Sequence, residues 1–140
     1  MASRRVTGIG GIFFKSKDPA GMREWYGKHL GFKTDTYGAN FETRRGDQPG
    51  LKASCVWAPF ADNTKYFAPS TKEFMINFRV DNLAGLVGDL RKNGVQILDE
   101  IAEYEYGKFV HILDPEGNKV ELWEPADEPY ETDAGDAPAI

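Results

Sequence analysis

Two helix boundaries that recur 63 residues apart constrain the fold of this chain more than any other feature. Asp18 precedes one predicted helix and Gly31 ends it, while Asp81 precedes a second and Gly94 ends that one. Aspartate is a favoured N-cap residue, and glycine readily takes the left-handed conformation that follows a helix. The distance from Asp to Gly is 13 residues in both places. We therefore predict two copies of one structural unit.

Each unit is predicted to open with a strand, continue with the helix and close with several more strands. Strands are expected at 32–37 and 95–98, directly after the two helices. One such unit cannot cover both faces of its own sheet. The predicted fold class is therefore α+β, with two βαβββ modules forming curved mixed sheets around a cup and the helices outside.

The division of the chain follows from the same repeat. One domain is expected over residues 1–125, with modules at about 6–60 and 73–125. Residues 126–140 contain five acidic side chains and no basic one, so this tail is expected to be disordered.

A β-hairpin is predicted from the run FVHILDPEGNKVELWEP at 109–125. Two segments rich in β-branched, aromatic and aliphatic residues flank Asp-Pro-Glu-Gly-Asn, a strong turn sequence. With a five-residue turn, His111 lies opposite Glu121, and the two side chains share a face with Trp123. A register slip of one residue would separate them.

The run DPEGNKVEL, together with Trp25-Tyr26 and Leu30-Gly31-Phe32, resembles the vicinal-oxygen-chelate superfamily. That superfamily includes glyoxalases, bleomycin-resistance proteins, fosfomycin-resistance enzymes and extradiol dioxygenases. The resemblance extends from Val6 to Pro125 and implies curved sheets around a cup, in agreement with the repeat. Because the superfamily contains lyases, transferases, isomerases, oxygenases and binding proteins, the resemblance leaves the activity open.

Metal-dependent relatives bind a divalent ion through four inward groups, one from each of four strands. The resemblance puts one of these positions on Glu121, which is the only ligand position that the chain retains. The other three positions fall on Gly11, on Phe74 (or Met75 after a shift of one residue) and near Trp57 or Cys55. Glycine, phenylalanine and tryptophan offer no oxygen or imidazole nitrogen to such an ion. We therefore expect no divalent metal and no other cofactor. A zinc site built from Glu121, His111 and Cys55 is the alternative.

Aromatic and titratable residues are the candidates for the site. Five aromatic residues are predicted to bind a ligand in the cup: Trp57, Phe74, Tyr106, Phe109 and Trp123. His111 and Glu121 are the candidate catalytic pair, since a carboxylate orients a histidine that acts as a general base. The alternative is structural: the aromatic residues fill the core, His111 is a satisfied core histidine, and Glu121 bonds only to its neighbours.

Composition excludes several classes of partner. A net charge of −5 argues against a nucleic-acid surface. No apolar run approaches the ~20 residues of a membrane helix, and the single cysteine fits a reducing, cytoplasmic compartment. A homodimer is expected because exposed sheet edges of such a repeat are often paired between subunits.

Three functions follow from these observations. The first is a metal-independent protein of glyoxalase/bleomycin-resistance type that binds a small apolar or aromatic molecule. The second is a divergent glyoxalase-type lyase or isomerase that uses His111 and Glu121. The third is a structural or interaction module whose cup is filled by its own side chains. The missing metal positions and the many aromatic residues favour the first.

Overall fold

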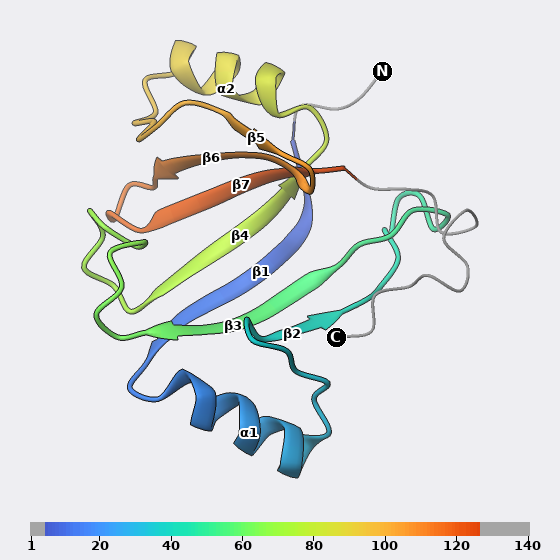
Figure 1. The fold of residues 1–140 in the computed structure, drawn as a ribbon. Helices are drawn as coiled ribbons and strands as arrows, with labels where there is room; N and C mark the ends of the chain where they lie inside the picture. Colours follow the sequence, from blue (N-terminus) through green and yellow to red (C-terminus); the bar gives the residue numbers. More distant parts are fainter. Residues whose placement is uncertain (1–4, 127–140) are drawn as a thin grey trace.

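The computed structural model describes residues 5–126, which form seven strands and two helices (Figure 1). In chain order these elements are β1 (Val6–Ser16), α1 (Pro19–Leu30), β2 (Ala39–Phe41), β3 (Cys55–Ala61), β4 (Phe74–Val80), α2 (Leu83–Lys92), β5 (Ala102–Tyr104), β6 (Gly107–Leu113) and β7 (Lys119–Pro125). The strands form a mixed sheet in the order β2-β3-β1-β4-β7-β6-β5. The predicted α+β fold with outer helices is confirmed. Neither helix is long and apolar enough to cross a membrane in the part of the chain described.

The two modules meet at β1 and β4, the opening strand of each. These strands pair antiparallel, from Val6 opposite Val80 to Phe14 opposite Phe74. Each also pairs parallel with a later strand of its own module, β1 with β3 and β4 with β7. One continuous sheet therefore replaces the two separate sheets expected from the sequence. We propose on this basis that residues 1–125 form one domain; apart from Ala126, the predicted acidic tail lies outside the described residues.

Both helices begin and end close to the predicted residues. The Asp18 side chain caps α1 by accepting a hydrogen bond from the Gly21 amide at 3.0 Å, and Gly31 ends it with a φ of 75°. In the second module Asn82, rather than Asp81, caps α2. Asp81 instead accepts hydrogen bonds from the Arg45 guanidinium, which ties the long loop of the first module to the second module.

The strands expected directly after the helices are reduced to single bridges. Over 32–37 only Thr34 pairs, with Ala39, because the Asp35 side chain accepts hydrogen bonds from the amides of Tyr37 and Gly38 and turns the chain there. Over 95–98 only Ile97 pairs, with a residue of β6. Local turn chemistry therefore leaves the first module with three strands, whereas the second keeps four because β5 forms after the expected segment.

The two faces of the sheet carry different side chains, because successive residues of a strand point to opposite sides. The outer face packs against the helices: Val80, Val110 and Leu122 contact Leu83 and Val87 of α2 in the main apolar cluster. The inner face carries a row of cross-strand neighbours, namely Gly11, Asn77, Glu121 and His111. Figure 1 shows α1 and α2 along opposite margins of the sheet.

Candidate functional site

The predicted hairpin is present in the predicted register. Strands β6 and β7 pair with His111 opposite Glu121. In the turn, the Asp114 carboxylate accepts hydrogen bonds from the amides of Glu116 and Asn118, both at 2.9 Å. This local bonding holds the five-residue turn and therefore holds the register that brings the two titratable side chains together.

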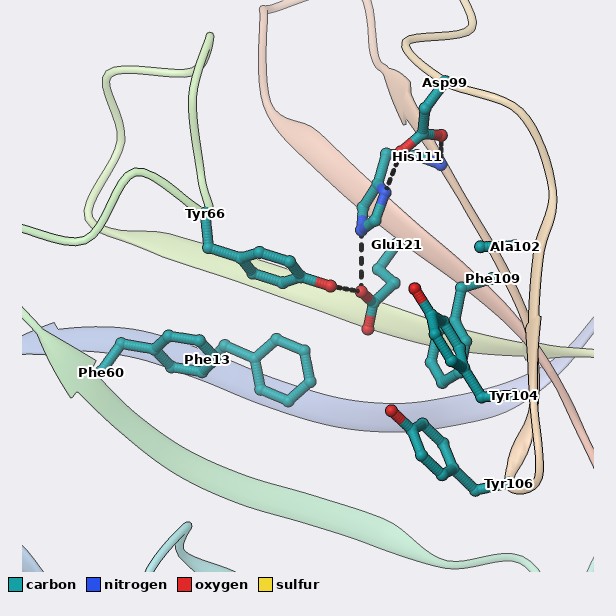
Figure 2. A pocket seen from close by; sticks show the side chains of 10 residues that line it. All are labelled: Phe13, Phe60, Tyr66, Asp99, Ala102, Tyr104, Tyr106, Phe109, His111 and Glu121. Carbon is teal, nitrogen blue, oxygen red and sulfur yellow. Dashed lines mark hydrogen bonds and ion pairs between the residues drawn. The ribbon is translucent and has the colours of Figure 1, made fainter.

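The imidazole of His111 bridges two carboxylates (Figure 2). Its Nε2 lies 2.7 Å from Oε2 of Glu121, and its Nδ1 lies 2.7 Å from Oδ2 of Asp99. The His111 backbone amide also donates to Oδ1 of Asp99 at 2.8 Å. Asp99 therefore sets both the position and the ring orientation of His111.

The carboxylate of Glu121 receives three hydrogen bonds. Oε1 accepts from Nδ2 of Asn77 at 2.6 Å, and Oε2 accepts from the Tyr66 hydroxyl as well as from His111. Only 3% of Glu121 is exposed to solvent. Its negative charge is thus stabilised by donors of the chain itself rather than by water.

Burial and hydrogen bonding act in opposite directions on these groups. Burial favours the neutral form of Glu121, but the hydrogen bonds from His111, Tyr66 and Asn77 outweigh it and lower the pKa of this carboxyl. Burial also opposes charge on His111, but its bonds to Glu121 and Asp99 outweigh this and raise the pKa of the imidazole. Burial and the neighbouring Glu121 carboxylate raise the pKa of Tyr66 far above its usual range. The arrangement favours an imidazolium between two carboxylates.

A cavity of about 530 Å³ opens beside this chain of hydrogen bonds. Its walls are mostly aromatic, as Figure 2 shows. The lining residues are Phe13, Phe60, Tyr66, Asp99, Ala102, Tyr104, Tyr106, Phe109, His111 and Glu121. The volume lies within the range of pockets that hold small molecules.

Comparison with known families identifies the fold. The model of the Glyoxalase/Bleomycin resistance protein/Dioxygenase superfamily matches residues 8–122. This chain belongs to that superfamily. The resemblance that the hairpin and the first helix indicated is therefore confirmed, whereas no curated protein matches the chain.

Solved structures of the glyoxalase superfamily share the fold. A methylmalonyl-CoA epimerase from Streptomyces coelicolor is 19% identical, with a TM-score of 0.65 over 87% of this chain and 99% of that one. The epimerase from Mycobacterium tuberculosis is 23% identical, with a TM-score of 0.58 over 90% and 93%. A Mn(II)-bound glyoxalase from Novosphingobium aromaticivorans is 17% identical, with a TM-score of 0.61 over 91% of this chain and 42% of that one. At these identities the likeness shows the fold alone.

The residues of this superfamily member do not fit the divalent ion of its metal-dependent relatives. Glu121 already accepts three hydrogen bonds, and its inner-face neighbours are Gly11, which has no side chain, and Asn77, whose amide donates to it. Among the residues described, no three His, Cys, Asp or Glu side chains converge as metal ligands. Burial also raises the pKa of the Cys55 thiol, which disfavours the thiolate that the alternative zinc site needs.

Two of the five predicted ligand-binding aromatic residues line the cavity, Tyr106 and Phe109. A third, Trp123, lies behind them. Its ring stacks on Phe109 with a centroid distance of 5.9 Å, and its Nε1 donates to the Tyr106 carbonyl at 3.0 Å. Trp123 therefore supports the wall rather than forming it.

The other two predictions, Trp57 and Phe74, are wrong about the face of the sheet. Trp57 packs on the outer face against Tyr26 of α1, with ring centroids 4.6 Å apart. Phe74 pairs with Phe14, whose ring also contacts Trp57, so it lies on the outer face too. The assignment of a metal-ligand position to Phe74 is therefore wrong by one residue. Met75, the next residue, holds the position on the inner face.

Seven residues of the site are absent from the predicted set. Two come from loops, one from β4, two from β5, and two from inner positions of β1 and β3; in this order they are Asp99, Tyr66, Asn77, Ala102, Tyr104, Phe13 and Phe60. Tyr66 stands between the two predicted modules, in a stretch to which no site residue was assigned. Strict alternation along β1 would have assigned Phe13 to the same face as Gly11; the other six carry no comparable sequence signal.

Proposed function

We propose that this superfamily member is a metal-independent protein that binds a small apolar or aromatic molecule in the cavity beside His111. The internal hydrogen bonding of the buried Glu121 carboxylate carries this proposal. Three donors of the chain occupy its carboxylate, so the one retained ligand position is used for internal hydrogen bonds. Displacing them with a cation would leave buried donors without partners, which costs about 1–3 kcal/mol for each one.

The aromatic walls support binding over a filled cup. Tyr104 and Tyr106 stack with centroids 5.5 Å apart and remain 54% and 61% exposed. On the other side, Phe60 and Tyr66 stack at 5.8 Å. Packed cores seldom leave tyrosine rings stacked and open to solvent beside a cavity, whereas ligand pockets combine aromatic walls with a few polar groups.

Next to the cavity, the inner face of the sheet is filled by the protein's own side chains, as the filled-cup alternative predicts. There the Arg79 guanidinium donates to the carbonyls of Lys52 and Ser54 at 3.0 and 3.4 Å, and it lies 5.3 Å from the Trp123 ring. Arg79 is 3% exposed. The chain's own side chains thus fill this part of the inner face, which confines the proposed site to the part beside His111.

Proton transfer by His111 and Glu121, as in a glyoxalase-type lyase or isomerase, is the second candidate. The position of an imidazole between two carboxylates at a cavity wall favours it. However, both ring nitrogens and both Glu121 oxygens already have partners, so a base would first have to break one of these bonds. Turnover of a hemithioacetal by the wild type, and its loss in His111→Gln, would favour this candidate over simple binding.

A ligand screen that follows tryptophan fluorescence and the melting temperature tests the binding proposal. Planar apolar compounds should quench Trp123, which supports the wall, and should raise the melting temperature. The protein carrying Trp25→Phe and Trp57→Phe should retain this quenching, because only Trp123 lies beside the cavity. Phe109→Ala should weaken binding by about 1–3 kcal/mol through the lost aromatic contact.

The matched control is Phe74→Ala, which removes an aromatic ring from the outer face. It should leave ligand affinity unchanged. If a broad set of planar compounds neither quenches fluorescence nor shifts the melting temperature, the proposal fails and the filled-cup module replaces it.

Homodimer formation and a cytoplasmic location stay proposals. The edge strands β2 and β5 have three residues each, so they offer little backbone for pairing between subunits. Support for a dimer comes instead from the outer face, where Ile9, Ile12 and Phe74 are 49%, 42% and 41% exposed. The single cysteine of the sequence, Cys55, supports a reducing compartment.

A further inference from the structure

The charge of the cavity wall is negative. Two of its lining side chains are carboxylates, Asp99 and Glu121, and one is the imidazole of His111. No lysine or arginine lines the cavity in the described part of the chain. Even with a full positive charge on His111, the wall carries one net negative charge. The Lys119 ammonium lies 5.0 Å from the centroid of the Tyr66 ring but does not line the cavity. A carboxylate or phosphate ligand would therefore meet repulsion from the wall itself.

Asp99 is the carboxylate that a ligand can reach. Its side chain is 45% exposed, against 4% for that of Glu121. Each Asp99 oxygen accepts one hydrogen bond from His111, and a carboxylate oxygen can accept a second. An exposed acceptor with spare capacity thus stands at the cavity wall, while the other carboxylate is buried and hydrogen-bonded inside the protein.

The aromatic rings add to this negative potential. In Figure 2, Phe13, Phe60 and Tyr66 stand on one side of Glu121, and Tyr104, Tyr106 and Phe109 stand on the other. The faces of aromatic rings attract cations, and ammonium groups are bound in this way by cages of several rings. Aromatic walls and an accessible carboxylate select for the same kind of ligand.

We propose that the cavity binds an organic ammonium cation, with the cationic head between the aromatic walls near Asp99 and an apolar or aromatic remainder filling the rest. This inference rests on the proposed binding function and names the chemical class of its ligand. It excludes organic anions as the preferred ligands of this site.

A pair of probes that differ by one atom tests the inference. (3-Hydroxyphenyl)trimethylammonium and 3-tert-butylphenol have nearly the same shape, but the quaternary nitrogen of the first is a carbon in the second. Isothermal titration calorimetry at fixed ionic strength should give an affinity at least about tenfold higher for the cation, as expected for a desolvated cation over aromatic rings.

The outcomes separate the inference from the proposed function. If both probes bind and the neutral phenol binds as tightly as the cation or more tightly, the cation inference is overturned while small-molecule binding stands. If neither probe binds at millimolar concentration and the screen of planar compounds is also negative, the proposed function fails and this inference fails with it. If neither binds but planar neutral compounds do, only the cation inference is overturned.

A charge-specific variant locates the cation. Asp99→Asn should reduce the affinity for the ammonium probe several-fold and leave the affinity for the neutral phenol unchanged, which also shows that the cavity is intact. Glu103→Gln removes the same charge from β5, at a residue that does not line the cavity, and should change neither affinity by more than about twofold because solvent screens it. Equal effects of the two substitutions on the ammonium probe would contradict a site at Asp99.

Discussion

Replacement of Glu121 by glutamine should lower the titration midpoint of His111. The two side chains share a hydrogen bond of 2.7 Å, and they are only 3% and 7% exposed. A buried hydrogen bond to a charged group contributes about 1.5–3 kcal/mol. Since one pKa unit corresponds to about 1.36 kcal/mol, the pKa of His111 should fall by about one to two units. In this variant burial still disfavours the charged imidazolium, and only the Asp99 carboxylate remains to stabilise it.

An NMR pH titration of the imidazole protons measures this shift directly. The signal of His29, the only other histidine, serves as the reference in the same spectra. Asp99→Asn is the matched comparison: it removes the carboxylate at the other ring nitrogen, but Asp99 is 45% exposed and solvent screens its charge. The decrease in the His111 pKa should therefore be smaller than for Glu121→Gln. An unchanged His111 titration in Glu121→Gln would refute the described hydrogen bond and the catalytic alternative together.

The same substitution should destabilise the protein most in a defined pH window. The pKa of His111 is raised on folding, so its contribution is full below the ordinary value of 6.5 and is lost as pH rises through the folded pKa. The pKa of Glu121 is lowered, so its contribution is full above 4.5 and is lost as pH falls through the folded pKa. Glu121→Gln should therefore cost most, roughly 3–5 kcal/mol, between about pH 4.5 and 6.5. Urea unfolding at pH 5.5 and pH 8.5 should show the larger difference from wild type at pH 5.5.

Three further outcomes are expected. Gly10→Ala should destabilise the fold by about 1–3 kcal/mol in thermal unfolding. The added methyl group would collide with Asn77 Oδ1 and would lie 2.9 Å from the Trp123 ring. Gly8→Ala is the control and should cost less, because a methyl group there meets nothing within 4 Å. Elemental analysis after dialysis should find far less than one zinc, nickel or iron ion per chain, and a chelator should not change the melting temperature; a stoichiometric ion would overturn the metal-independent proposal. Light scattering at micromolar concentration should give twice the chain mass, and a monomer would contradict the homodimer.

What the sequence determined by itself is the local part of this protein. Asp18 and Gly31 bound the first helix because capping depends on residues within a few positions. The five-residue turn sets the register of the hairpin for the same reason, so the contact between His111 and Glu121 could be predicted from spacing alone.

Only the tertiary structure decided which other groups surround Glu121. Tyr66 and Asn77 reach its carboxylate from 55 and 44 residues away, and Asp99 reaches His111 from a loop 12 residues before it. Trp57 was expected on the inner face of the sheet but lies on the outer face. Because successive residues of a strand point to opposite faces, a shift of one residue is enough to cause this change. Contacts of this kind depend on how β1 and β4 join the two modules into one sheet and on the path of the loop that carries Tyr66. Neither is determined by the residues near Glu121 in sequence, because pairing between distant strands is set by the packing of the whole chain.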